Sequence, residues 1–251
     1  MNVYANEYHV PHAAPSPEPP ADAAADWEAW RAERRRSVTS ATGNLALVET
    51  RWAPDGERPD PDAARTGQPD TVTVTTLERT DAVTGAPEYG LRFWDAHSPA
   101  IRHFDRTDVF PYDPSWVLEA SYTPVTGARR VPFEHIRDNG GTRDLVVPGD
   151  IELTLDGRDY TLSAFDDDGT LLLVFGDPTN GDTTYGAGRF LFVTRTGEGR
   201  VLLDFNRAFV PPCGFSDQYN CPMPPRQNRF HLPVTAGEKR PVFRDGFPAQ
   251  H

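Results

Sequence analysis

Three polar residues, Arg189, Asp204 and Asn206, stand in or beside two strongly apolar stretches of the sequence, residues 189–193 and 201–205. Apolar stretches of this length are typical of buried strands. A charged side chain in such a place is unfavourable unless it has a partner. The pattern therefore predicts either a buried ion pair or a site that holds a ligand.

The turn sequence Thr196-Gly-Glu-Gly predicts that these two stretches form a hairpin. Side chains alternate along a strand, so Asp204 and Asn206 should share one face. Arg189 would then lie within reach of Asp204 or Asn206 across the hairpin. Two interpretations remain open: a structural ion pair that closes a barrel end, or an arginine that holds a ligand carboxylate or phosphate, oriented by Asn206.

The leading functional hypothesis is a small-molecule site, for an anionic ligand in particular, at the mouth of a β-barrel or sandwich. A rigid proline-rich loop, residues 211–225, would form one wall, and Asn228, Arg229 and Lys239 could add polar groups. The candidate ligand-binding residues are Tyr185, Gly186, Gly188, Arg189, Asn206, Arg207 and Asn228.

Two alternative functions remain open. Asp204 beside apolar neighbours could have a raised pKa and act as the general base of a hydrolase or transferase. A noncatalytic interaction domain could instead use the helix that carries Trp27 and Trp30, or a sheet edge, to bind a protein partner. The sequence leaves open whether any reaction is catalysed and which cofactor, if any, is used.

Motifs of several common enzyme classes are absent from the sequence. It has no Gly-x-Ser-x-Gly elbow, no His-Glu-x-x-His zinc motif and no phosphate-binding loop ending in Gly-Lys. Gly186-Ala-Gly188 begins like a dinucleotide fingerprint, but the third glycine is missing and a strand follows. Positive φ angles or a close backbone approach explain these glycines better.

The two cysteines, Cys213 and Cys221, allow three interpretations. They could be free, half-buried thiols, which is usual in a reducing cytosol. They could form a local disulfide, if the loop brings them together. They could also bind zinc, although Cys-x-x-Cys spacing is missing and only His231 is near as a third ligand. We predict no metal site.

Composition restricts the partners. The chain has 251 residues and a formal net charge of -12, which opposes nonspecific binding to nucleic acid or anionic lipid, although a local basic site remains compatible with it. No apolar stretch is long enough to span a bilayer, and no secretory signal is recognisable, so we expect a soluble, cytoplasmic protein. The oligomeric state is left open.

The elements that would position these residues are mostly strands. Asp22–Arg36 is the one convincing helix, and its tryptophans should dock it onto a sheet. The segments expected as strands are 45–52, 71–77, 89–94, 101–104, 117–122, 130–136, 151–155, 160–165, 170–175, 189–193 and 201–205, with hairpin turns at Asp156-Gly157 and before Thr170. The expected fold is mainly β, an antiparallel sandwich or barrel with one N-terminal amphipathic helix and a C-terminal proline-rich covering loop.

We expect one domain, residues 22–251, after a disordered tail, residues 1–21, in which His9 and His12 are solvated. Within the domain, residues 22–37 form the helix, 71–205 the strands and 206–240 the proline-rich segment. Residues 53–70 are expected to be a loop without core-forming residues.

Several motifs resemble a known family. They are Phe175-Gly-Asp, Thr183-Thr-Tyr-Gly-Ala-Gly-Arg-Phe-Leu, Leu203-Asp-Phe-Asn-Arg-Ala-Phe, Pro211-Pro-Cys-Gly-Phe, Cys221-Pro-Met-Pro-Pro, Asn228-Arg and Ala236-Gly-Glu-Lys. Together they resemble the bacterial family called domain of unknown function 1684, over about residues 26–240. Gly43-Asn-Leu-Ala-Leu departs from the Gly-Trp-Leu stretch usual there. The resemblance implies no established activity.

Overall fold

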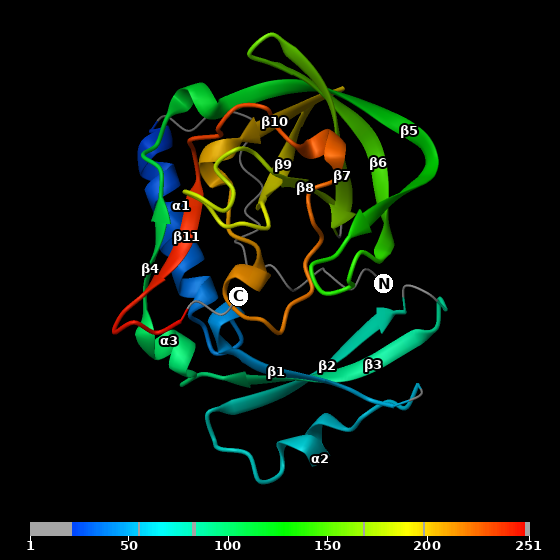
Figure 1. Ribbon diagram of the computed structural model, residues 1–251, viewed down its shortest axis with the longest axis vertical. Helices are drawn as coiled ribbons and strands as arrows, with labels where there is room; N and C mark the ends of the chain where they lie inside the picture. Colours follow the sequence, from blue (N-terminus) through cyan, green and yellow to red (C-terminus); the bar gives the residue numbers. More distant parts are fainter. Residues whose placement is uncertain (1–21, 55, 82–83, 168, 198, 249–251) are drawn as a thin grey trace.

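The largest element of the fold is a closed antiparallel β-barrel (Figure 1). The computed structural model describes residues 22–54, 56–81, 84–167, 169–197 and 199–248. The order of strands around the barrel is β10-β5-β6-β7-β8-β9. Their bounds are Val117–Glu134 (β5), Thr142–Leu155 (β6), Arg158–Asp167 (β7), Thr170–Phe175 (β8), Arg189–Gly197 (β9) and Arg200–Asp204 (β10). The mainly β fold with a barrel, predicted from the sequence, is confirmed.

Within the described residues, two smaller sheets and three α-helices accompany the barrel. A three-stranded sheet has the order β1-β3-β2, and β11 pairs with β4. Their bounds are Leu47–Trp52 (β1), Val72–Thr80 (β2), Pro87–Asp95 (β3), Phe104–Val109 (β4) and Glu238–Phe243 (β11). The α-helices are Ala23–Val38 (α1), Pro61–Arg65 (α2) and Pro99–His103 (α3). The 3-10 turns are Asn44–Ala46 (η1), Pro114–Trp116 (η2), Phe205–Arg207 (η3), Pro212–Gly214 (η4) and Arg226–Asn228 (η5).

Tight hairpins set the register of the barrel. Leu155 pairs with Arg158 across a two-residue turn. The turn residues, Asp156 and Gly157, have φ angles of 50° and 73°. Two consecutive positive φ angles match the twist of antiparallel strands, and Asp-Gly adopts them readily. The hairpin predicted at this position is confirmed, as is the pairing of β9 with β10.

The barrel interior is filled by side chains that alternate along the strands. On β8, Leu171, Leu173 and Phe175 belong to the interior cluster, whereas Leu172 and Val174 belong to a second cluster outside the barrel wall. Each of these five side chains is at most 1% exposed. A barrel of this size has room only for packed side chains, so its interior serves as a hydrophobic core.

Helix α1 and the proline-rich segment cover the outside of the barrel. Asp22 caps the helix by accepting a hydrogen bond from Ala25 N. Trp27 and Trp30 are buried in the outer cluster, and Trp27 Nε1 donates to the main-chain oxygen of Asn206 at 2.8 Å. The predicted helix and its docking through the tryptophans are therefore confirmed.

The structure corrects the expected strand at residues 101–104. Residues Pro99–His103 form helix α3 instead, because the Ser98 hydroxyl accepts from Ile101 N and a proline follows at the first helical position. The next strand begins only at Phe104.

Two further expectations about boundaries were wrong. The strands expected at 117–122 and 130–136 are one strand, β5, which absorbs the turn-like residues in a register shift between Pro124 and Arg129. A bulge of this kind keeps a strand in its ladder despite unfavourable residues. The segment 53–70 contains helix α2, and its Ala64 packs against a small cluster under the three-stranded sheet.

Some expectations concern residues outside the described part of the chain. The tail, residues 1–21 with His9 and His12, is among them. Within the described ranges, none of the helices has the length and apolar character needed to cross a membrane.

Candidate functional site

Arg189 lies at one end of the barrel and is completely buried. Its Nη2 donates to Asp177 Oδ2 at 2.8 Å and to the Val234 oxygen at 2.8 Å. Its Nη1 donates to the oxygens of Ala236 at 2.5 Å and Glu238 at 3.3 Å. The guanidinium therefore ties the start of β9 to the segment that leads into β11.

The ion-pair partner expected for Arg189 was wrong. Asp177, two residues beyond the end of β8, takes the place predicted for Asp204 or Asn206. Both carboxylate oxygens of Asp177 are used, because Oδ1 also accepts from Thr179 N at 2.8 Å and Val234 N at 3.3 Å. Among the described residues only Arg189 Nε of this pair is left without a hydrogen-bond partner, and a buried charge pair held by so many contacts has a structural role.

The oxygens of Asp204 are also occupied. Oδ1 accepts from the main-chain N and the Nδ2 of Asn206, at 3.1 Å and 3.0 Å. Oδ2 accepts from Arg207 Nε at 3.2 Å. A general base needs an accessible lone pair, and here donors of the chain itself compete for each oxygen. Arg207 also pairs with Asp26 of helix α1.

Asn206 and Asn228 are both fully buried and connect segments of the chain. The Asn206 amide accepts from the Asp113 main-chain N and donates to the Asp113 oxygen, at 2.9 Å each. The Asn228 amide accepts from Ser163 N at 2.9 Å and donates to the oxygens of Ser163 and Val174 at 2.8 Å each. It thus bridges β7 and β8 in the manner of a backbone group.

The two glycines of Gly186-Ala-Gly188 differ. Gly188 has a φ of 93°, and a Cβ there would meet Phe175 O at 2.6 Å and Pro224 Cγ at 2.5 Å. The expectation of positive φ and close approach is confirmed for Gly188. For Gly186 it is wrong, because a Cβ there would meet nothing nearer than 3.8 Å.

The barrel end at Arg189 is closed within the described part of the chain. The rings of Phe175, Phe205 and Phe230 pack edge to face there, with centroids 5.3 to 5.8 Å apart. The segment that follows Phe230 adds Val234 and Ala236 to the same interior cluster. Arg189 therefore points into packed protein rather than toward the opening predicted from the sequence.

A second buried ion pair escaped the sequence analysis. Arg34 of helix α1 lies 3.4 Å from Glu238 of β11, and their side chains are 2% and 4% exposed. Arg34 also donates to the Val210 oxygen at 2.9 Å, and Glu238 accepts from Val210 N at 2.8 Å. The helical spacing carried a signal for Arg34, because it continues the buried face of Trp27 and Trp30 toward Val38, whereas Arg35 and Arg36 are exposed. Its partner Glu238 lies far away along the chain and has no such local signal.

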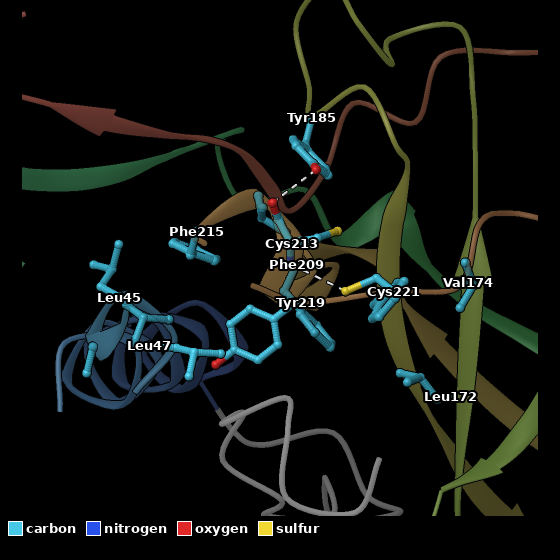
Figure 2. Close-up of a cluster of buried hydrophobic side chains, with 14 of the residues drawn as sticks. Leu45, Leu47, Leu172, Val174, Tyr185, Phe209, Cys213, Phe215, Tyr219 and Cys221 are labelled. Atoms are coloured by element: carbon cyan, nitrogen blue, oxygen red, sulfur yellow. Dashed lines mark hydrogen bonds between the residues drawn. The ribbon is translucent and has the colours of Figure 1, made fainter. Parts of the chain in front are cut away.

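The two cysteines lie together in the outer cluster, beside Tyr185 (Figure 2). Neither forms a disulfide, and they are 3% and 5% exposed, which is more buried than expected. The main-chain N of Cys213 donates to Cys221 Sγ at 3.3 Å, and the Tyr185 hydroxyl donates to the Cys213 oxygen at 3.1 Å. His231 contacts Tyr160 instead. The described residues contain no group of three histidines, cysteines or carboxylates that could hold a metal ion.

The ionisation of Cys213 and Tyr185 follows from this packing. Burial acts to raise the pKa of Cys213, but the Cys221 thiol and the Tyr185 hydroxyl beside its sulfur lower it, and the lowering prevails. Burial, together with the neighbouring Cys213, raises the pKa of Tyr185 well above its ordinary value. Tyr185 therefore stays protonated and remains a hydrogen-bond donor.

A group of arginines outside the barrel combines charge with access, because Arg137 within it is exposed. This arginine cluster consists of Arg79, Arg92, Arg137 and Arg143, and sequence analysis did not single it out. Arg92 lies over the Tyr219 ring, with its Cζ 5.1 Å from the centroid. The main-chain oxygen of Tyr219 accepts a hydrogen bond from Arg137 Nε at 3.0 Å.

The other two members of the cluster, Arg143 and Arg79, each pair with a carboxylate. Arg143 binds both oxygens of Asp138, at 2.7 Å and 3.0 Å, and Asn220 Nδ2 also donates to Asp138 at 2.8 Å. Arg79 stacks on Trp52 with its Cζ 3.7 Å from the ring centroid, and it pairs with Glu88 at 2.6 Å. The four arginines thus lie near two carboxylates.

His135 lies inside this group and is 3% exposed. Its pKa is lowered from 6.5 to about 4, chiefly by burial and also by the charges of Arg143 and Arg79, while the hydrogen bond to the Phe133 oxygen and the charge of Asp138 act in the opposite direction. Its Nδ1 is 3.1 Å from the Phe133 oxygen. The ring is therefore neutral at pH values near neutrality, and it leaves the positive charge to the arginines.

The model of one protein family matches residues 102–239, more than half of the chain. The family is described as protein of unknown function, DUF1684. The chain belongs to this family. The resemblance inferred from the motifs is confirmed, and the arginine cluster lies partly within the matched residues, since Arg137 and Arg143 are inside and Arg79 and Arg92 are outside.

One solved structure similar to the chain is the solution structure of an uncharacterized protein from Haloarcula marismortui. Its sequence is 33% identical, and the match covers 54% of this chain and 77% of that chain, with a TM-score of 0.45. No curated protein matches the chain.

Proposed function

We propose that this member of the DUF1684 family binds a small anionic molecule at the arginine cluster, outside the barrel. The observation that carries the proposal is the state of Arg137. Its main-chain N donates to Asn220 Oδ1 at 2.9 Å and its Nε to the Tyr219 oxygen at 3.0 Å. Its two terminal amino groups have no protein partner within the described ranges, and the residue is exposed.

An arginine held in this way suits an anion. A guanidinium anchored through Nε loses less side-chain freedom on binding than one that moves freely. Its two terminal amino groups can donate in parallel to a carboxylate or a phosphate. Arg137 therefore provides the polar anchor that the sequence analysis sought in Arg189, at a different place in the fold.

The surrounding charges favour the same class of ligand. Arg92 and Arg143 lie near Arg137 through Tyr219, Asp138 and Asn220, and the charge of Arg79 acts together with that of Arg143 on the neighbouring His135. Glu88 and Asp138 pair with Arg79 and Arg143. The chain as a whole has a net charge of -12, so this local excess of positive charge stands out from the surface. The overall charge repels long polyanions and leaves a compact anion as the ligand.

The exposed apolar surface argues against a protein partner. Within the described part of the chain, the large hydrophobic side chains counted as exposed are Val48 and Ile136, at 43% and 39%. Single exposed residues of this kind do not make a docking patch. A small ligand is therefore better supported than an interaction domain.

The test is binding of defined probes to the purified full chain. Isothermal titration with inorganic phosphate, citrate and a nucleoside monophosphate should identify at least one that binds. Arg137→Ala should weaken that binding by at least about tenfold, since a charge-assisted hydrogen-bond pair contributes roughly 1.5 to 3 kcal/mol.

Arg226→Ala is the matched control. It removes the same charge from an exposed position in η5, where the described residues provide no hydrogen bond to its side chain. This variant should bind like the wild type. An equal loss of affinity in both variants would show that only the overall charge matters, which contradicts a site at Arg137. Unchanged binding by Arg137→Ala would also refute the proposal.

A further inference from the structure

Cys213 and Cys221 stand close enough to react with each other, and no part of the proposed anion site uses them. Cys221 Sγ lies 3.3 Å from the main-chain N of Cys213. The N–Cα bond is about 1.46 Å, so this sulfur lies within roughly 4.8 Å of the Cys213 Cα. The Cα–Cβ, Cβ–S and S–S bonds of a disulfide span such a distance, the last of them being about 2.04 Å.

The surroundings of the pair hold both thiols in one place. The loop between them begins with turn η4 and lies in the outer cluster, where both side chains are buried. Figure 2 shows the two cysteines side by side, with the Cys221 sulfur directed at the Cys213 backbone. Tyr185 fixes the Cys213 carbonyl from the other side. The loop therefore presents two thiols to each other rather than to solvent.

We propose that Cys213 and Cys221 form a reversible disulfide when the protein meets a peroxide, and that they are a redox modification site of this chain. One thiolate attacks a peroxide oxygen, the O–O bond breaks, and a sulfenic acid and water result once the leaving hydroxide takes a proton. The second thiol then attacks the oxidised sulfur. The S–S bond forms, the S–O bond breaks, and the oxygen leaves as a second water with the proton of the thiol.

The surroundings of the two thiols support this order of reaction steps. The Cys221 sulfur accepts a hydrogen bond from a backbone N–H, which stabilises a thiolate. Within the loop the second thiol is always near, so it intercepts the sulfenic acid before a further peroxide molecule oxidises it. Burial slows the first step, because the peroxide has to reach a covered sulfur, but it also keeps other thiols from competing.

The test uses the full chain, reduced with a dithiol and then freed of it. The protein is treated with hydrogen peroxide under native conditions, quenched, denatured, alkylated with iodoacetamide and digested with trypsin. The cleavage sites Arg207 and Arg226 release both cysteines in one peptide, residues 208–226. Wild-type protein should lose alkylation at both cysteines in most molecules, and the peptide should be lighter by two hydrogen atoms. A dithiol should restore both alkylation sites.

Single variants separate the bond from other oxidation. Cys221→Ser and Cys213→Ser should each give no disulfide-containing peptide. Each should instead accumulate a sulfenic acid that dimedone traps. Met223 in the same peptide reports that peroxide reached this region. Two alkylatable cysteines beside an oxidised Met223 would overturn the proposal, as would sulfinic acid as the main product in the wild type. None of these readouts depends on anion binding.

Discussion

Arg189 and Arg137 both donate to main-chain oxygens, but they differ in whether their terminal amino groups donate to other protein groups. Arg189 uses its two terminal amino groups on Asp177 and on three carbonyl oxygens and is completely buried. Arg137 uses Nε alone on Tyr219 and is exposed. The same side chain thus holds the fold in one region and presents unused donors in the other.

Burial explains the difference. A charge removed from water needs every available partner, so the barrel end gathers a carboxylate and carbonyls around Arg189. At the surface, water can satisfy the amino groups of Arg137, and the proposed anion would replace it. The position of a charge in an apolar stretch is therefore evidence of structural importance, and it says little about ligand binding.

The largest effect is expected from Arg189→Met. The change leaves the Asp177 carboxylate buried without its cation and three carbonyl oxygens without donors. Loss of one partner from a buried pair destabilises a protein by about 3 to 5 kcal/mol. Urea unfolding followed by circular dichroism should show this decrease. A decrease below about 1 kcal/mol would mean that the buried pair does not hold the barrel end, and the contrast with Arg137 would disappear.

A smaller, pH-dependent effect is expected from His135 in the second region. Its pKa is about 4 in the folded protein and near the ordinary value of 6.5 in the unfolded chain. Between these values the unfolded chain binds more protons than the folded one, so stability falls as the pH is lowered through this window. From about pH 7 to about pH 5, the wild type should lose roughly 2 kcal/mol more than His135→Gln, because one pKa unit corresponds to about 1.4 kcal/mol.

The control for this measurement is His97→Gln, which changes an exposed histidine. This variant should follow the wild type at each pH in urea unfolding experiments. The charges that face His135 are those of Arg143, Arg79 and Asp138, and they are unchanged in both variants. Parallel pH curves for the wild type and His135→Gln would contradict a neutral, buried ring.

The smallest effect is expected from Arg137→Met. The side chain gives up one hydrogen bond to the Tyr219 oxygen at the surface, where water can replace it. Surface substitutions of this kind change the free energy of unfolding by no more than about 0.5 kcal/mol. Calorimetry of the ligand-free protein is the measurement. A loss as large as that of Arg189→Met would make Arg137 a structural residue and remove the support for an anion site there.

Much of the fold was predictable because its signals are local. The Asp156-Gly157 turn, the spacing of Trp27 and Trp30 and the alternation of β8 each encode a local geometry, and each was confirmed. The expected strand at 101–104 failed for a local reason as well. A serine cap followed by a proline outweighed the short apolar stretch, and helix α3 formed.

That Arg189 needs a partner follows from the residue pattern alone, since a charge among apolar strand residues is too unfavourable without one. Which residue is the partner follows from the packing of distant segments. Asp177 lies 12 residues away, and the accepting carbonyl oxygens lie 45 to 49 residues away along the chain. Pairing of β8 with β9 brings Asp177 beside Arg189, and residues 234–238 pack over this barrel end. No local pattern encodes that packing. For the same reason the arginine cluster, whose members come from β2, β3, β6 and the turn after β5, became visible only in three dimensions.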